Sequence, residues 1–446
     1  MLYCASLEQI GRTPTRTHEE LIIMSTTPLA RAVALAALGS CLTLPSLAQA
    51  EFIKDSKASI EARNFYMNRD FRQDTATKNK AEEWAQGFLL RFESGYTEGT
   101  VGFGVDAIGA LGLKLDSSPD RAGTGLLPVG DSGKAPDDYS ELGATVKARI
   151  SKSTLKIGTL LPKLPSISAN DSRLLPQSFQ GGWLNSQEIG GLTFDAGQLN
   201  RINNRDSSNN QTMVLNGGTA KPGTRGFALA NGDSDEFNFA GLSYKWNDQL
   251  TTGYNYGALD GLYKQHIVNL VHVLPIADKQ TLKTDLRFAR STDDGDSNVD
   301  NKAFGAMFTY ALSGHSFGIG YQKMSGDTGY AYIGGTDPFL VNYVQIGDFA
   351  NKDEQSWQAR YDFNFASVGI PGLTFMTRYL SGDNIDRGAA ASEGKEWERD
   401  TDIAYVFQEG PLKNLGVKWR NATTRANFGN SYDENRLIVS YTLPLF

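Results

Sequence analysis

The chain ends with the stretch Leu437–Phe446 (LIVSYTLPLF), which alternates apolar with mixed positions and finishes on an aromatic residue. The apolar positions in one phase are Leu437, Val439, Tyr441, Leu443 and Leu445. A period of two is typical of a β-strand with one face in an apolar environment. A terminal strand of this kind is expected where a membrane barrel closes on itself. We therefore predict an all-β fold, a transmembrane antiparallel β-barrel.

The same alternation recurs within the chain, with charged residues in the second phase. From Trp357 to Phe365, aromatic residues and Ala359 share one face, and the other face carries Gln358, Arg360, Asp362 and Asn364. Charges of both signs on the second face favour a water-filled lumen over the wetted face of a soluble sandwich. Residues 88–96, 142–150 and 282–288 follow the same pattern, whereas Ile267–Leu274 is apolar in both phases.

Composition excludes several other classes of protein. The net charge of −7 argues against a nucleic-acid partner. Beyond Leu44 there is no apolar run of the ~18 residues that a membrane helix needs. The two cysteines, Cys4 and Cys41, both fall in the first 50 residues, so we expect no disulfide and no thiolate site in the processed chain.

The N-terminal region is typical of an exported protein. After Met24, Arg31 precedes an apolar run, and Ala48-Gln49-Ala50 fits a cleavage site for a signal peptide. We predict that residues 1–50 are an N-terminal extension and a cleaved signal peptide with Met24 as the true start, and that residues 51–446 form a single barrel domain. A lipoprotein signal at Cys41 is the alternative.

Connections between the expected strands are of two kinds. Compact Gly/Pro connectors occur at residues 366–372 and 410–414, and long polar loops are expected at 116–139, 163–187, 203–235, 292–301, 326–354 and 383–400. Short turns on one rim and long loops on the other are typical of outer-membrane barrels.

Several motifs resemble those of OprD-type porins, the outer-membrane carboxylate channels of pseudomonads. They include RNFYMNRDFR at 63–72, SGYTEGTVGFGVD at 94–106, DSRLLPQ at 171–177, SWQARY at 356–361 and RY at 378–379 followed by GDN at 382–384. The resemblance covers essentially the whole processed chain. It implies about 18 strands, inward-folded constriction loops, a monomer or weak homotrimer, and passive uptake of small carboxylates across the bacterial outer membrane.

The resemblance also implies a row of basic side chains along the lumen, which lowers the barrier for an anion leaving bulk water. Carried over by position, the candidate substrate-binding residues are Arg63, Arg69, Arg173, Arg205, Arg378, Lys418, Arg420 and Arg436, and Arg360 is a further candidate. Strand parity supports Arg436, Lys418 and Arg420, but in the first strand Phe65 and Met67 share the phase of Arg63 and Arg69. For the strand residues the alternative is a salt bridge within the lumen, as between Arg360 and Asp362.

Two loop residues stand out. Arg173 lies in a proline-bounded segment where an inward loop narrows the pore, and its planar guanidinium suits a carboxylate; the alternative is an arginine that bonds loop carbonyls. Asp337, in a loop that resembles the other constriction, is a candidate for the opposite end of a substrate; the alternative is a turn-forming Asp before Pro338.

We expect no catalytic residue, metal site or cofactor. Gly314–Gly318 fits the Gly-x-Ser-x-Gly pattern around Ser316, but the chain continues as strand where a hydrolase needs a helix, and Ser132 lies in a polar loop without a triad partner. The acidic run Asp293–Asp296 is interpreted as solvated loop charge rather than a Ca²⁺ or lipopolysaccharide-bridging loop.

Three functions therefore remain, in order: a selective carboxylate channel, a non-selective or structural outer-membrane barrel such as an adhesin, and an outer-membrane serine hydrolase. Within the first, we favour aromatic or aliphatic monocarboxylates, with basic amino acids as the alternative. Expected partners are small carboxylates, membrane lipid and lipopolysaccharide.

Overall fold

The computed structural model describes residues 52, 54–73, 78–216, 225–229, 232–389, 391–429 and 431–446. The predicted extension, the signal peptide, both cysteines and the cleavage site lie outside the described residues. In the part of the chain that is described, no helix is long and apolar enough to span a membrane.

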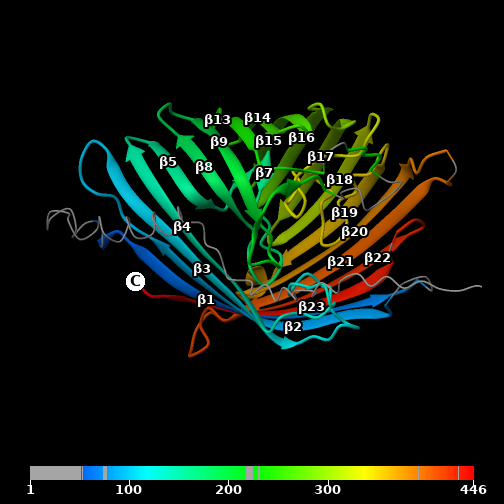
Figure 1. The fold of residues 1–446 in the computed structure, drawn as a ribbon, viewed down its shortest axis with the longest axis horizontal. Coiled ribbons are helices and arrows are strands. Elements are labelled where there is room, and N and C mark those ends of the chain that lie inside the picture. Colours follow the sequence, from blue (N-terminus) through cyan, green and yellow to red (C-terminus); the bar gives the residue numbers. More distant parts are fainter. Residues whose placement is uncertain are drawn as a thin grey trace, which may run out of the picture. The chain divides into compact units, whose positions relative to one another are not determined.

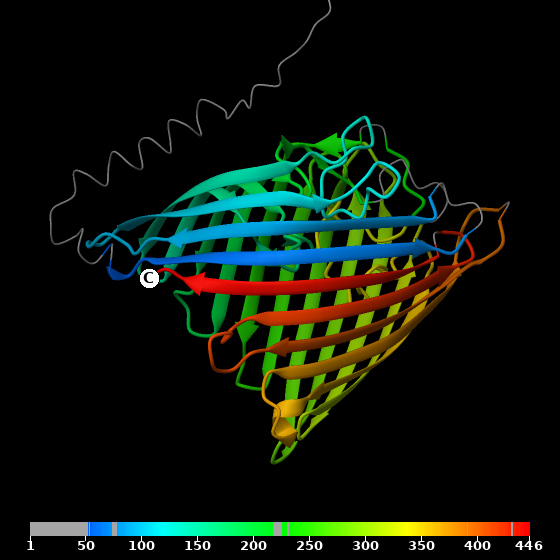
Figure 2. The same ribbon diagram turned by 90° about the horizontal axis from the view of Figure 1, so that it is seen from below.

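Eighteen long antiparallel strands, counted over the described residues, close into a barrel in which β1 pairs with β23. Figure 2 shows this seam, with the red β23 beside the blue β1. In chain order the strands are β1 (Lys57–Phe71), β2 (Lys80–Glu93), β3 (Gly102–Asp116), β4 (Asp138–Ile150), β5 (Ser153–Leu160), β8 (Ser178–Ser186), β9 (Leu192–Asn203), β13 (Phe237–Lys245), β14 (Leu250–Leu259), β15 (Tyr263–Ala277), β16 (Gln280–Asp293), β17 (Asp300–Leu312), β18 (His315–Ser325), β19 (Gln355–Asn364), β20 (Leu373–Ile385), β21 (Gly394–Val406), β22 (Gly416–Ala426) and β23 (Tyr432–Pro444).

Short segments complete the secondary structure. The two-residue β10 (Asn210–Gln211) extends the barrel sheet. Separate two-stranded pairs are formed by β6 (Lys163–Leu164) with β7 (Ile167–Ser168) and by β11 (Met213–Val214) with β12 (Asp233–Ser234). A 3₁₀ turn, η1 (Phe365–Val368), links β19 to β20. In Figure 1, β7 and the green loop segments near it lie within the ring of strands.

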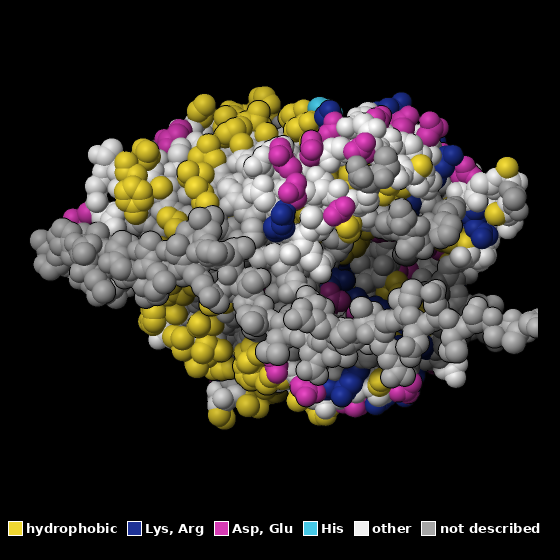
Figure 3. All heavy atoms as spheres, in the orientation of Figure 1, with side chains coloured by type: hydrophobic (Ala, Val, Ile, Leu, Met, Phe, Trp, Pro, Cys, Tyr) yellow, Lys and Arg dark blue, Asp and Glu magenta, His cyan; other side chains and the backbone are white. Residues whose placement is uncertain are grey.

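The outer wall exposes large apolar side chains, as the alternation predicts. Leu142 on β4 is 86% exposed and Ile319 on β18 is 69% exposed. Trp357, Trp419 and Leu437 are exposed in the same way. Figure 3 shows hydrophobic side chains (yellow) in several patches on the molecular surface. Because water would penalise so much apolar surface, this face fits a lipid environment.

The two rims differ in loop length, as expected. The turns after β4, β15 and β17 are short and lie on the rim that carries the start of β1 and the end of β23, and the longest connections, which lie on the other rim, join β3 to β4, β9 to β13 and β18 to β19. The predicted loop 163–187 is wrong in its second half, because β8 pairs in register with β5 and β9 there. The apolar–polar alternation that marks a strand is not visible there, because Gly181 and Gly182 have no side chains. The predicted loop 383–400 likewise contains the end of β20 and the start of β21.

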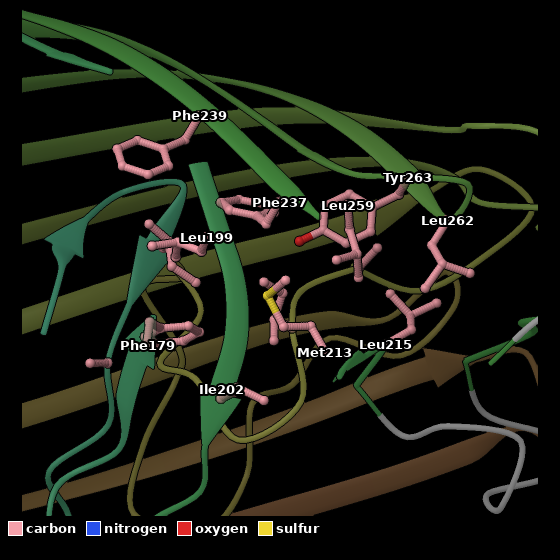
Figure 4. Close-up of a cluster of buried hydrophobic side chains, with 14 of the residues drawn as sticks. Phe179, Leu199, Ile202, Met213, Leu215, Phe237, Phe239, Leu259, Leu262 and Tyr263 are labelled. Atoms are coloured by element: carbon pink, nitrogen blue, oxygen red, sulfur yellow. The ribbon is translucent and has the colours of Figure 1, made fainter. Parts of the chain in front are cut away.

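Inward-folded loops cover apolar patches on the inner wall. In Figure 4, Met213 and Leu215 from the β9–β13 loop face Phe179, Leu199 and Phe237 of the wall. Ile267 of β15 is 1% exposed and packs in one cluster with residues of the β18–β19 loop. Strand β15 is therefore apolar in both phases because one face meets lipid and part of the other lies beneath a loop.

An inserted loop also explains why the first strand, β1, carries apolar residues on its inward face. Phe65 and Met67 point inward and are buried with Leu174 and Leu175 of the β5–β8 loop. Gly87 on β2 lies directly beneath this loop, since a Cβ there would sit 3.1 Å from Leu174 Cγ. The apolar residues that share the inward face of β1 with Arg63 and Arg69 thus pack against the loop that narrows the pore.

Candidate functional site

Strand register places the predicted basic residues on one continuous part of the inner wall, from β19 through β23 to β1. Arg360 lies opposite Arg378, which lies opposite Asp400. In the neighbouring row Asp402 lies opposite Arg420, and Arg420 opposite Arg436. Directly opposed side chains have Cβ atoms about 5 Å apart, so basic and acidic groups interleave along this wall.

Each basic strand residue of this wall has an acidic partner. The bond lengths are 2.7 Å for Arg378 to Asp400, 3.0 Å for Arg420 to Asp402 and 2.6 Å for Arg69 to Glu434. The remaining pairs are Arg360 with Asp362, Lys418 with Asp402 and Arg436 with Glu434. These strand residues therefore form salt bridges within the lumen, which was the alternative to direct substrate binding.

Arg63 anchors the β5–β8 loop to the first strand. Its guanidinium donates to the carboxylate of Asp171 at 2.7 Å, pairs with Glu61 and donates to the backbone carbonyl of Arg173. These bonds fix the start of the constriction segment to the first strand. Arg63 thus helps to fix the position of that segment.

Arg173 differs from the basic candidates on the strands. Its side chain is nearly buried, makes no salt bridge within the described chain, and donates only to the carbonyl and hydroxyl oxygens of its neighbour Ser172. Its Nε has no hydrogen-bond partner among the described residues. Burial, and then the positive charges of Arg436 and Arg205, lower the pKa of Arg173 well below its usual value. A guanidinium is not deprotonated in proteins, so Arg173 keeps its charge. A nearby anion would lower the unfavourable free energy of this buried charge.

Arg205 completes the basic cluster from the β9–β13 loop. It donates to Asn170 Oδ1 at 2.7 Å and to the Ser172 hydroxyl at 3.0 Å. The nearby Asp206 carboxyl is partly buried, and burial raises its pKa.

Asp337 connects the two constriction loops. Its carboxylate accepts hydrogen bonds from Asn170 Nδ2 at 2.5 Å and from the Tyr343 hydroxyl at 2.8 Å, and Lys163 Nζ lies 3.8 Å away. Burial raises the pKa of Asp337. Its side chain is 30% exposed, so it remains in contact with the lumen while it holds the two loops together.

Acidic residues of β21 position the β18–β19 loop, and sequence reasoning did not find them. Glu398, fully buried, accepts the backbone N–H groups of Ile346 at 3.0 Å and Gly347 at 2.7 Å. Asn351 donates to both Glu354 and Glu396. The sequence did contain a signal for these anchors, because acidic residues alternate along β21 in the phase that faces inward. Buried carboxylates require hydrogen-bond donors, so such a run predicts a loop that supplies them.

An open chamber lies on the inner wall toward the short-turn rim. Its volume is about 310 Å³, and its lining includes Ser316, Arg360, Asp362, Asp402 and Lys418. It is therefore a mixed-charge, water-accessible continuation of the basic row.

The hydrolase pattern does not form a nucleophile elbow. Ser316 lies within β18, and no helix follows it. His315 takes the opposite phase, where it stacks on Phe363 at 4.4 Å and bonds the Tyr361 hydroxyl, so it faces away from Ser316. Among the described residues, no group of three His, Cys, Asp or Glu side chains could hold a metal ion.

Comparison with known proteins agrees with this architecture. The chain is 41% identical to the porin-like protein GalP of Pseudomonas putida over 92% of this chain and 97% of that protein. It is 39% identical to porin D of Pseudomonas aeruginosa over 88% of this chain and 92% of that protein. The crystal structure of Pseudomonas aeruginosa OpdQ superposes with a TM-score of 0.82 at 69% identity, covering 89% of this chain and all of that chain. A family model described as outer membrane porin, OprD family, matches residues 50–445. The chain therefore belongs to the OprD family of outer-membrane porins.

Proposed function

We propose that this porin is selective for small carboxylates, which enter along the basic inner wall and pass the constriction at Arg173. The single observation that carries the proposal is the state of Arg173, a buried cation without a carboxylate partner among the described residues. The strand arginines already have acidic partners. Arg173 and Arg205 therefore lack a carboxylate partner within the described residues, and Arg173 is the more buried of the two.

At the constriction, basic groups can replace some of the hydrogen bonds that a passing carboxylate makes with water. Arg173 supplies a guanidinium edge, and Arg69, Arg205 and Arg436 add positive potential, while Glu434 partly offsets it. A weak site of this kind lowers the entry barrier without trapping the anion. Beyond it, the chamber with Arg360 and Lys418 continues the path toward the short-turn rim.

Within the carboxylates, the proposal favours monocarboxylates with an aromatic ring. The inward Tyr432 ring lies 5.3 Å from the Arg69 guanidinium carbon, next to the basic cluster. An aromatic acid can place its carboxylate on the arginines and its ring against such an apolar face. Basic amino acids are the second candidate, because Asp337 is 30% exposed and could bind an ammonium group.

The test is uptake into liposomes that contain purified protein, with a panel of labelled compounds: an aromatic monocarboxylate, an aliphatic monocarboxylate, lysine and a neutral sugar. Arg173→Gln should slow both monocarboxylates by about tenfold or more, since a hydrogen bond to a charged group contributes about 1.5–3 kcal/mol. The neutral sugar should be unaffected. Faster uptake of lysine than of either acid by the wild type would favour the amino-acid channel.

Arg201→Gln is the matched control. Arg201 is 42% exposed at the extracellular end of β9 and pairs with Asp235, so the substitution removes the same charge outside the constriction. Equal uptake by Arg173→Gln, Arg201→Gln and wild type would refute the role of Arg173. A barrel that passes every compound according to size alone would indicate a non-selective porin.

A further inference from the structure

The outer wall carries a row of basic side chains at the long-loop ends of four consecutive strands, β15–β18. Register places His266 opposite Arg290, and Arg290 opposite Lys302. Lys302 lies opposite Ser325, so Lys323, two residues earlier on β18, is its diagonal neighbour. Their phase is that of Phe288 and Phe304, which are exposed on the outer surface. These side chains therefore face away from the lumen.

Only part of this positive charge is neutralised within the protein. Arg290 pairs with Asp300, and Lys264 pairs with Asp294. Lys302 and Lys323 are exposed, and within the described residues neither forms an ion pair. Directly opposed like charges, such as Arg290 and Lys302, are unfavourable in a sheet. An external anion that bridges them removes this repulsion.

The depth of the row restricts what that anion can be. Phe304 lies directly opposite Lys323, and Tyr321 and Trp357 form the next exposed pair toward the short-turn rim. Exposed aromatic residues mark the interface of a membrane barrel, with lipid tails below and headgroups above. Figure 3 shows charged side chains gathering where the yellow hydrophobic surface ends. The long-loop rim is the outer face in such barrels, so the cations lie at the depth of outer-leaflet headgroups.

We propose that Arg290, Lys302 and Lys323 form a binding site for a phosphate-bearing lipid headgroup of the outer leaflet. The guanidinium and the two ammonium groups provide the donors, and cross-strand spacings of about 5 Å to 8 Å let one phosphate, or two phosphates of one headgroup, bridge them. The adjacent pair formed by His266 Nδ1 and the Tyr254 hydroxyl, 2.8 Å apart, provides further polar contact. The site lies outside the lumen and is independent of the carboxylate path.

Native mass spectrometry of detergent-solubilised barrel, titrated with diphosphorylated lipid A, tests the site. Wild type should retain bound lipid A, and Lys302→Gln/Lys323→Gln should need about a 30-fold higher concentration for the same occupancy. The control Lys57→Gln/Lys413→Gln removes two exposed lysines at the short-turn rim and should bind as wild type does. Single-channel conductance and the gel shift of the unheated barrel should be normal in both variants, which shows that each is folded.

Three results would overturn the proposal. Equal lipid A occupancy in the wild type and in Lys302→Gln/Lys323→Gln is the first. Equal binding of lipid A that lacks its phosphates is the second, because hydrophobic contact would then suffice. Displacement of lipid A by millimolar inorganic phosphate is the third, because it would indicate a site for the free ion and not for a headgroup.

Discussion

Replacing Glu434 by Gln should strengthen the interaction of the channel with anions. Glu434 is fully buried, and its carboxylate accepts bonds of 2.6 Å from Arg69 and 2.6 Å from Arg436. Gln345 Nε2 also donates to it at 3.1 Å. Glutamine keeps the size and an acceptor oxygen but removes the negative charge, so the basic cluster gains one net positive charge.

The magnitude follows from Coulomb's law. For a substrate carboxylate about 7 Å from Glu434, the removed repulsion is about 0.6 kcal/mol in water and about 2.4 kcal/mol at an effective dielectric constant of about 20. This corresponds to about 3-fold to 60-fold tighter binding in the constriction. Because the cluster is partly enclosed by the two loops, we expect a value inside this range and above its lower limit.

Single-channel recording in planar bilayers measures this effect. Added monocarboxylate should block the current of Glu434→Gln for longer than it blocks wild type, and the reversal potential in a salt gradient should shift toward anions. Glu409→Gln, which removes an exposed charge in the β21–β22 turn, should behave as wild type. Shorter blocks or an unchanged reversal potential in Glu434→Gln would show that the cluster does not set the field in the pore.

Two further outcomes concern the inserted loops. Leu174→Ala should cost the β5–β8 loop about 3 kcal/mol of packing against Phe65 and its neighbours and should increase open-channel current noise, whereas a quiet channel would show that Leu174 does not hold the loop. Burial and then the adjacent Glu396 raise the pKa of Glu354 well above 4.5. The folded loop therefore favours protonated Glu354, and its anchoring is fully present at low pH and weakens as pH rises through the raised pKa. Current fluctuations should thus increase with pH in the wild type and not in Glu354→Gln; the opposite pH trend would contradict this reasoning.

Local patterning was sufficient to predict the barrel wall. The alternation from Trp357 to Phe365 predicted which side chains face outward, and register and exposure agree with it. The pattern failed at β8, where Gly181 and Gly182 have no side chains to reveal a phase. It was ambiguous at Ile267, because an inward apolar residue can only be explained by a loop that arrives from far along the sequence.

The sequence could predict which residues lie at the constriction, but it could not predict which hydrogen bonds they form. Proline spacing and resemblance drew attention to Arg173, and the structure places it in a buried cluster of arginines. Parity could not show that Arg63 is occupied by Asp171 and by loop carbonyls, because that contact joins residues 108 positions apart. Nor could it show that Glu398 holds the backbone of Ile346, since a hydrogen bond to a main-chain N–H leaves no trace in the sequence of the donor.

The central claim is that the constriction acts on the charge of the substrate. The most direct test compares, in the same liposomes, the wild-type uptake rates of an aromatic monocarboxylate and of its uncharged amide, which has nearly the same size and shape. We predict that the carboxylate enters faster and that Arg173→Gln removes the difference. Equal rates for the two compounds in the wild type would contradict it.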